Sequence, residues 1–294
     1  MVLAAGAGRR YGGAKQLEPV GPSGEILSDY LVHDARRAGA ARALFVVAPG
    51  LEDAFLEHGS RIHPGFPLAC VVQQLDAPAS STPRSVPWGT AHALLAAAPR
   101  LDSGFMLGNA DDYYGQDAVR AGGAALGLPG LAGVARATVA AYRLRDTLSP
   151  RGAVSRALLE VDPRGRVTGV VELSGLVAED SGVVARSDGL TWTLTGDEPV
   201  SMNLWTFPLE VLPAFAAGFR EFLSSAGTTE EEHAEFRLPE AVNREVAAGN
   251  LTVHAIPCTD RWFGLTHPDD LPGVREAIRD LVDRGVYSSP LAAV

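Results

Sequence analysis

The stretch that decides the fold opens the chain, where Met1-Val-Leu-Ala-Ala5 runs directly into Gly6-Ala-Gly8-Arg-Arg10-Tyr-Gly-Gly13-Ala-Lys15. The apolar residues are typical of a buried strand. The glycines that follow let backbone N–H groups approach an anion closely, because no Cβ stands in the way. The segment therefore predicts a phosphate-binding loop at the end of a first buried strand.

Two common phosphate-binding patterns do not fit this loop. The Walker pattern requires Gly-Lys followed by Ser or Thr, whereas Lys15 is preceded by alanine and followed by glutamine. The dinucleotide pattern requires Gly-x-Gly-x-x-Gly opening a helix, whereas Gly6, Gly8 and Gly12 are spaced Gly-x-Gly-x-x-x-Gly. The segment therefore matches neither of these two patterns.

Strand and helix signals alternate through the first 130 residues. We expect strands at residues 43–48, 68–73 and 104–107. We expect one helix to be capped by Ser28-Asp29 and to end near residue 38, and a second to cover residues 90–98. This alternation favours a mostly parallel sheet covered by helices.

Beyond residue 131 the pattern changes to strand-like runs separated by turns. The expected strands cover residues 133–144, 157–161, 167–173, 190–195 and 200–207. Polar helices are expected at 228–249 and 268–284, with Pro239 as a break in the first of them or as the first turn of a new helix. These strands should be antiparallel or mixed and should extend the same sheet into a second lobe. No linker or repeat interrupts the chain, so we expect one domain, residues 1–294, with parts 1–130 and 131–294.

Composition excludes several classes of function. The chain has 25 basic and 35 acidic residues, a net charge of −10, and no basic tract that would suit nucleic acid or an anionic membrane. No apolar run approaches the roughly 18 residues of a membrane span. Cys70 and Cys258 lie far apart without metal or redox spacing, so we interpret both as packed thiols of a cytoplasmic protein.

Three segments carry a resemblance to a known family. Leu3-Ala-Ala-Gly6-Ala-Gly8-Arg-Arg10, followed by Lys15-Gln-Leu-Glu-Pro19, resembles the signature loop of the sugar-nucleotide pyrophosphorylase-like nucleotidyltransferases, L-A-A/G-G-x-G-x-R…K-x-L-x-P. Gly89-Thr-Ala-His-Ala93 resembles the family's segment beside the base, and Leu107-Gly-Asn-Ala-Asp111-Asp112 resembles its acidic motif. The resemblance implies an α/β fold with a Rossmann-like, glycosyltransferase A-type nucleotide-binding domain of three layers, and a smaller sugar-phosphate lobe.

The resemblance also implies a reaction. A nucleoside monophosphate passes from a nucleoside triphosphate to a sugar 1-phosphate or similar phosphorylated acceptor, and pyrophosphate is released. Such a displacement depends on positioning and on cations where charge accumulates. Arg10 would hold the β- and γ-phosphates, Lys15 would bridge phosphate oxygens near the reacting centre, and Asp111 would bind Mg²⁺. Lys15 is the only lysine of the chain.

Further residues would bind the two substrates. The resemblance places residues 1–130 at the nucleotide and residues 131–294 at the acceptor. The residues expected to hold base and ribose are Leu3, Ala4, Ala5, Gly6, Ala7, Gly8, Gln73, Gly89 and Thr90. The residues expected to hold the acceptor are Gly152, Glu172 and Asn203. Members of the family commonly assemble, so a homo-oligomer is a candidate state.

The chain departs from the family pattern at two positions. Glu172 is followed by leucine, where the family has a lysine that binds the acceptor phosphate, so Arg156 or Arg151 would have to replace it. Gly264 stands where many members carry a second metal-binding aspartate, for which Asp260 is a candidate substitute.

These departures leave two alternatives open. The chain could be a non-catalytic, nucleotide-binding regulatory relative that kept the fold and lost part of the chemistry. It could also be a glycosyltransferase, which would use the acidic motif to hold a metal. Arg10 and Lys15 argue against the second alternative, because the diphosphate of a sugar-nucleotide donor lacks the third phosphate that they are expected to meet.

Overall fold

The computed structural model describes residues 1–6, 15–75, 86–128, 130, 133–179, 182–187, 189–225 and 234–292. Its strands are β1 (Val2–Ala4), β2 (Ala43–Val47), β3 (Leu68–Val72), β4 (Phe105–Asn109), β5 (Asp112–Tyr113), β6 (Ala135–Arg143), β7 (Val154–Val161), β8 (Arg166–Glu179), β9 (Gly182–Ser187), β10 (Leu190–Leu194), β11 (Pro199–Phe207), β12 (Leu251–Pro257) and β13 (Phe263–Gly264). Its α-helices are α1 (Leu27–Arg37), α2 (Glu52–Ile62), α3 (Thr90–Ala97), α4 (Gln116–Leu126), α5 (Leu212–Ser225), α6 (Leu238–Ala247) and α7 (Leu271–Asp283). Short 3₁₀ turns are η1 (Lys15–Leu17), η2 (Ala98–Arg100), η3 (Leu144–Thr147), η4 (Leu209–Val211) and η5 (Pro268–Asp270).

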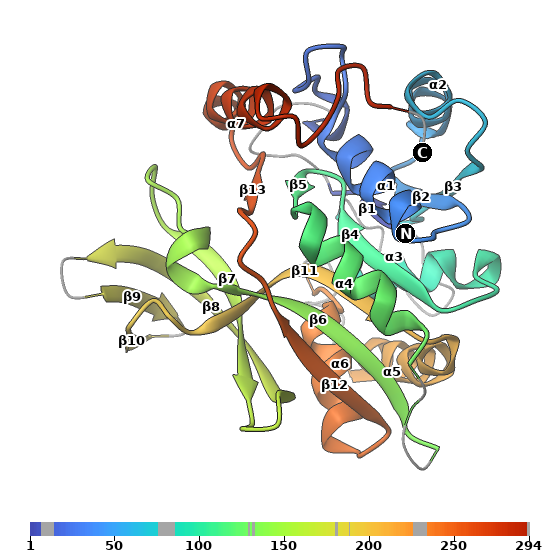
Figure 1. The fold of residues 1–294 in the computed structure, drawn as a ribbon. Helices are drawn as coiled ribbons and strands as arrows, with labels where there is room; N and C mark the ends of the chain where they lie inside the picture. The colour runs from blue at the N-terminus through green and yellow to red at the C-terminus, as the bar shows by residue number, and fades with distance from the viewer. Residues whose placement is uncertain are drawn as a thin grey trace.

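These elements form a mixed α/β structure around an 11-stranded sheet (Figure 1). The strand order is β10-β9-β8-β12-β6-β11-β4-β1-β2-β3, with β7 pairing β11 and β8 off this path. A separate two-stranded ladder joins β13 to β5. The expectation of a mixed sheet with covering helices is confirmed, but the sheet as a whole is not mostly parallel: among the described strands only the β1–β2, β1–β4, β2–β3 and β6–β12 ladders are parallel.

The first part of the sheet is parallel. β1 pairs with β2 on one side and with β4 on the other, and β2 pairs with β3, all in parallel. Every residue of β1 and β2 is buried. Strands covered on both faces read as continuous apolar runs, which is why these segments could be recognised in the sequence.

The start of α1 differs from the prediction. The helix begins at Leu27, so Ser28 and Asp29 lie inside its first turn and do not precede it. The Asp29 carboxylate reaches back and accepts a hydrogen bond from the Ile26 N–H at 2.8 Å. Asp29 therefore caps the helix as predicted, but from its third residue, where a carboxylate also suits the positive end of the helix dipole.

The second part of the sheet is mixed, as expected. β11 is antiparallel to β4 and so joins the two parts, while β12 runs parallel to β6. Strands β9 and β12 were not predicted. β12 inserts between β6 and β8, although it lies far beyond both in the sequence.

For the helical segment expected at residues 228–249, the structure confirms the alternative in which Pro239 lies in the first turn of a new helix. The structure begins α6 at Leu238, with Pro239 in its first turn, and residues 226–233 lie outside the described part of the chain. Proline lacks the N–H that a helix interior needs, so it is tolerated in the first turn and not further along.

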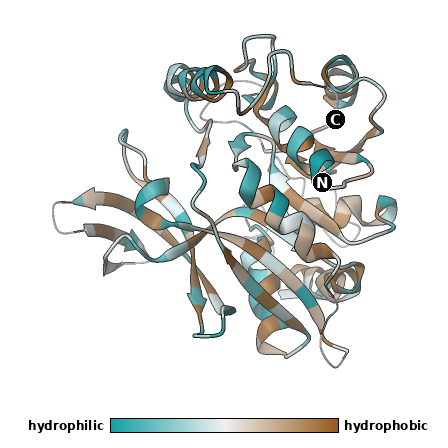
Figure 2. Ribbon diagram, in the orientation of Figure 1, coloured by the Kyte–Doolittle hydropathy of each residue, from teal (hydrophilic) through white to brown (hydrophobic). Residues whose placement is uncertain are grey.

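Apolar clusters cover both faces of the sheet. Leu3 of β1 belongs to one cluster, with α3 and α5, and Val2 and Ala4 belong to the other, with α1 and α4. Figure 2 shows hydrophobic residues concentrated along the central strands. Among the described residues, no helix is both long and apolar enough to cross a membrane.

Candidate active site

A cavity of about 690 Å³ opens at the carboxyl ends of β1 and β4. Leu3, Ala5 and Gly6 reach it from β1 and the residues that follow, and Asn109 and Asp111 reach it from the end of β4. β1 and β4 are parallel neighbours, so their carboxyl ends meet at one edge of the sheet. That edge is the usual place for a ligand in an open α/β sheet.

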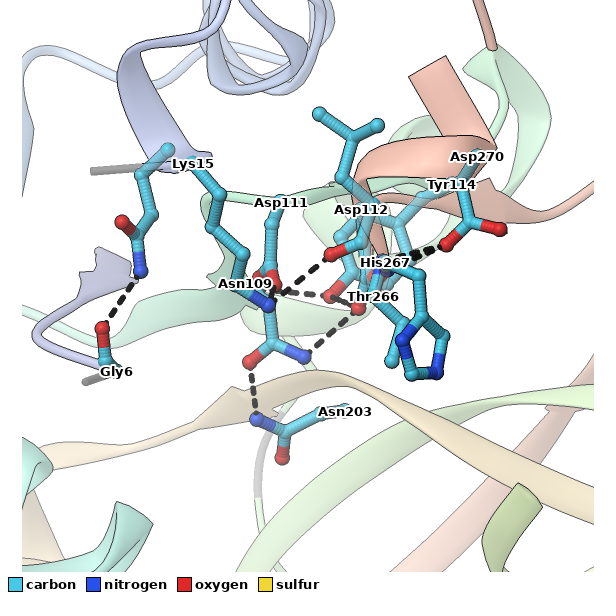
Figure 3. Close-up of polar contacts among 12 residues, drawn as sticks. Gly6, Lys15, Asn109, Asp111, Asp112, Tyr114, Asn203, Thr266, His267 and Asp270 are labelled. Carbon is cyan, nitrogen blue, oxygen red and sulfur yellow. Dashed lines mark hydrogen bonds and ion pairs between the residues drawn. The ribbon is translucent and has the colours of Figure 1, made fainter. Parts of the chain in front are cut away.

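Lys15 and Asp111 meet at this edge. Lys15 Nζ forms an ion pair with Asp111 Oδ2, and it also donates a hydrogen bond to the Leu265 carbonyl at 3.0 Å (Figure 3). The Leu265 N–H in turn donates to the Asp111 carbonyl at 2.9 Å. Two of the residues predicted to be catalytic, distant in sequence, are therefore in direct contact.

A chain of polar side chains lies beneath this ion pair. Asn203 Nδ2 donates to Asn109 Oδ1 at 2.7 Å, and Asn109 Nδ2 donates to Asp112 Oδ2 at 2.8 Å (Figure 3). Asn203 has a φ of 69°, in the left-handed region that asparagine tolerates better than most residues. The Tyr114 hydroxyl also donates to Asp112 Oδ2, at 3.3 Å. The network holds Asp112 in one orientation next to Asp111.

Asp112 is buried and has an unusual environment for a carboxylate. Its burial, and then the negative charge of Asp111, raise the pKa of Asp112 to about 7, while the hydrogen bond from Asn109 opposes that rise. Two carboxylates this close repel each other unless a cation or a proton compensates them. Their position at the cavity therefore suits a divalent cation.

Gly264 explains how Asp112 fits. Gly264 lies opposite Asp112 in the β13–β5 ladder, and a Cβ at position 264 would stand 2.3 Å from Asp112 Oδ1. The Asp112 carboxylate thus occupies space that a side chain at 264 would need. The expected substitute, Asp260, is wrong: its Oδ2 accepts the Ala118 N–H at 2.7 Å at the start of α4, and Asp260 does not line the cavity.

The residues present would supply some of the ligands of a magnesium ion, and the substrate and water would have to supply the others. Among the described residues, no group of three or more His, Cys, Asp or Glu side chains forms a complete metal-binding cluster. Mg²⁺ in nucleotide enzymes usually takes one or two carboxylates and completes its shell with water and phosphate oxygens. Asp111 and Asp112 match that donor set.

The opposite wall is formed around Gln73 and Gly89. Gln73 Nε2 donates to the Gly89 carbonyl at 3.0 Å, and Thr90 Oγ1 accepts the Leu238 N–H at 2.9 Å. Gly89 has a φ of 94°, and a Cβ there would lie 2.6 Å from the Phe236 carbonyl oxygen. Only glycine fits at this position.

Two arginines face the cavity from the second part of the chain. The Arg156 guanidinium lies 5.0 Å from the centre of the Trp262 ring, and burial lowers its pKa to about 10. Arg237 Nη1 lies 3.2 Å from Glu172 Oε2, and both side chains are partly exposed. Arg237 carried no recognised site signal in the sequence, whereas Trp262 opens the segment at residues 262–264 that was compared with the family's second metal motif.

Most of the described residues that were predicted for the site line this cavity: Leu3, Ala5, Gly6, Lys15, Gln73, Gly89, Thr90, Asp111, Glu172 and Asn203. Two do not. Ala4 points to the opposite face of the sheet, where it is buried in the core, because side chains alternate along a strand. Gly152 is exposed and lies outside the cavity lining. Three further predicted residues, Ala7, Gly8 and Arg10, lie outside the described residues.

Comparison with known proteins supports the architecture. No family model matches the chain, and no curated protein matches its sequence. Among solved structures, the chain is similar to the inositol-1-phosphate CTP transferase from T. maritima, with a TM-score of 0.62 and 16% identity, over 96% of this chain and 95% of that one. The chain therefore shares the fold of a nucleotidyltransferase over nearly its whole length.

Proposed function

We propose that the protein is a magnesium-dependent nucleotidyltransferase, which transfers a nucleoside monophosphate from a nucleoside triphosphate to a phosphorylated small molecule and releases pyrophosphate. The observation that carries the proposal is the contact between Lys15, the only lysine of the chain, and Asp111 in a cavity at the carboxyl ends of β1 and β4. The parallel order β3-β2-β1-β4 with its helices is what a Rossmann-like nucleotide-binding part requires.

In the proposed reaction, a phosphate oxygen of the acceptor attacks the α-phosphorus in line. A P–O bond forms there, the bond to the β-phosphate oxygen breaks, and that oxygen leaves with the electron pair as pyrophosphate. The nucleophile is already an anion, so no general base is needed. The residues act by positioning and by charge.

Each residue has a defined task in this proposal. Lys15 leaves Asp111 and neutralises oxygens of the α- and β-phosphates, while Asp111 and Asp112 hold the magnesium ion. When bound, the ion supplies positive charge to the phosphate oxygens. Gln73, Gly89 and Thr90 form the wall against base and ribose. Residues 6–15 would bind the terminal phosphates through Arg10, which lies outside the described residues.

We place the nucleotide on residues 1–130 and the acceptor on residues 131–294, and we place the protein in the cytoplasm. The alternative of a non-catalytic regulatory relative shares every binding feature and differs only in turnover. The test is pyrophosphate release with Mg²⁺, using the four ribonucleoside triphosphates and dTTP against sugar 1-phosphates, phospho-alcohols and inositol 1-phosphate. CTP with inositol 1-phosphate comes first, because the solved structure of similar fold is named for that pair.

We expect one pair to release pyrophosphate, and Asp111→Asn to abolish the release. The matched control is Asp280→Asn, an exposed carboxylate whose partner is Arg284 one helical turn away. Binding of a triphosphate without release from any pair would replace the proposal by the regulatory function. If no triphosphate is bound either, both fail.

A further inference from the structure

Arg156 is a half-buried cation on the wall of the cavity. Its Nε donates to the Thr147 carbonyl at 3.1 Å, its Nη1 donates to the Ser155 carbonyl at 2.7 Å, and its Nη2 also bonds the Thr147 carbonyl. The Trp262 ring covers one face of the guanidinium. Carbonyl dipoles and a ring orient the group but do not neutralise its charge.

No carboxylate compensates Arg156 at short range. In the part of the chain that the structure describes, the guanidinium forms no ion pair, and the one carboxylate with a charge interaction is Asp112, without a hydrogen bond. A buried charge is costly unless it is paired. A half-buried guanidinium that lines a cavity and has no ion-pair partner among the described residues is therefore suited to an anionic ligand, and its fork matches phosphate oxygens.

The other two candidate arginines, Arg237 and Arg151, already form ion pairs with carboxylates of this chain. Arg237 is paired with Glu172 at 3.2 Å and with Glu235 at 3.1 Å. Arg151, the other candidate from the sequence, is 44% exposed, lies 3.6 Å from Asp270, and does not line the cavity. Arg156 thus stands out as the unneutralised arginine of the described cavity wall.

The position of Arg156 also fits the proposed reaction. Its charge acts on Asp112, which adjoins Asp111, the partner of Lys15. An attacking phosphate must reach within about 3–3.5 Å of the α-phosphorus, so its anchor has to lie close to the metal carboxylates. In the β7–β8 ladder, Arg156 pairs with Leu173, and the Arg156 residue lines the same cavity as Lys15 and Asp111.

We infer that Arg156 binds the phosphate group of the acceptor. This inference rests on the proposed nucleotidyl transfer and adds the residue that recognises its second substrate. Thr147 and Trp262 are positioning residues, because they hold the guanidinium without touching the phosphate. The cavity then has a cation at each of two places, Lys15 for the triphosphate and Arg156 for the acceptor.

The test uses inorganic phosphate as the probe. The protein is saturated with Mg²⁺ and with the α,β-methylene analogue of the triphosphate that it binds most tightly among the four ribonucleotides, and phosphate is then titrated calorimetrically. The variants are Arg156→Gln, which keeps a hydrogen-bond donor near the Thr147 carbonyl but lacks the charge, and Arg156→Lys, which keeps the charge. Arg151→Gln is the matched control.

We expect phosphate affinity to fall at least tenfold in Arg156→Gln, less in Arg156→Lys, and not in Arg151→Gln, with nucleotide affinity unchanged in all three. In turnover, KM for the acceptor should rise while KM for the nucleotide stays constant. Unchanged phosphate binding in Arg156→Gln overturns the inference. Equal losses of nucleotide and phosphate affinity also overturn it, because Arg156 would then serve only as a counter-charge for Asp112.

Failure of the proposed function is detected separately, by measuring nucleotide binding to the unsubstituted protein. If the unsubstituted protein binds no nucleotide analogue, the nucleotidyl transfer and the inference built on it fall together, before any variant is compared. If Arg156→Gln does not fold, the Arg156→Lys protein decides, since loss of the planar fork alone should weaken phosphate binding and leave the melting temperature near that of the unsubstituted protein.

Discussion

The ion pair between Lys15 and Asp111 makes a quantitative prediction for stability. The two side chains are 16% and 20% exposed, so the pair lies between a surface pair and a fully buried one. Exposed pairs contribute about 0.2–1 kcal/mol, and breaking a fully buried pair costs about 3–5 kcal/mol. Lys15→Met leaves Asp111 without its partner, and we expect it to lower the free energy of unfolding by about 2 kcal/mol.

Asp111→Asn should cost a similar amount, because Lys15 then keeps only its bond to the Leu265 carbonyl. The double variant should also cost about 2 kcal/mol and not about 4, since the second substitution removes a charge that the first had already left unpaired. In a protein of 294 residues, whose entropy of unfolding is about 0.6 kcal/mol/K, each single variant should melt about 3 °C lower.

The assay is urea unfolding of the metal-free protein and its three variants, with turnover measured on the same samples. Turnover should fall by about 100- to 1,000-fold in either single variant, because charge at the transferring phosphate is no longer stabilised. Additive losses of stability in the double variant would refute the contact on which the site is built. Normal turnover in Lys15→Met would refute its role in the reaction.

Three further predictions concern backbone, pH and the acceptor wall. Gly89→Ala should lower the melting temperature more than Gly39→Ala does. Both glycines have a positive φ, which costs an alanine about 1–2 kcal/mol, but only the Cβ at position 89 would clash with a backbone carbonyl oxygen, at 2.6 Å. Burial alone would raise the pKa of Asp29, but hydrogen bonds from two histidines outweigh it and lower the pKa from 3.8. Asp29 therefore stabilises the fold above that pH and its contribution is lost as the pH falls further, so Asp29→Asn should flatten the acid limb of a stability–pH curve; an unchanged limb contradicts this. Trp262→Leu should raise KM for the acceptor about threefold to tenfold and leave KM for the nucleotide, because the face that orients Arg156 is lost; a change confined to the nucleotide KM would contradict it.

Local signals account for much of the first part of the fold. The runs ending in Ala4, Val47 and Val72 are apolar because each strand is covered on both faces, and this pattern can be recognised without knowing the partners. The capping carboxylate of α1 was identified too, but not its place, since helix bounds depend on which backbone N–H groups the folded chain leaves unpaired.

Non-local pairing could not be predicted in the same way. The insertion of β12 between β6 and β8 depends on contacts between distant segments, and the residues of β12 by themselves do not determine which strands will pair with it. The same holds for Asp260 and Asp112. The sequence shows only that both are acidic residues close to possible metal-binding motifs. The folded chain shows that Asp260 accepts a hydrogen bond at the start of α4 and that Asp112 occupies the space beside Gly264.

The sequence by itself determined the strand that leads into a glycine-rich loop, and the residue types that a phosphate site needs: a single lysine, a carboxylate after an apolar strand, and glycines without side chains. These are properties of short segments, in which the residue types determine both the local conformation and the available functional groups. Tertiary structure alone decided that Lys15 meets Asp111, that Arg156 lies half-buried beside the Trp262 ring with no ion-pair partner among the described residues, and that Gly152 stays outside the cavity. Such facts depend on which strands become neighbours, and that choice is made by the burial of the whole core and not by any one segment.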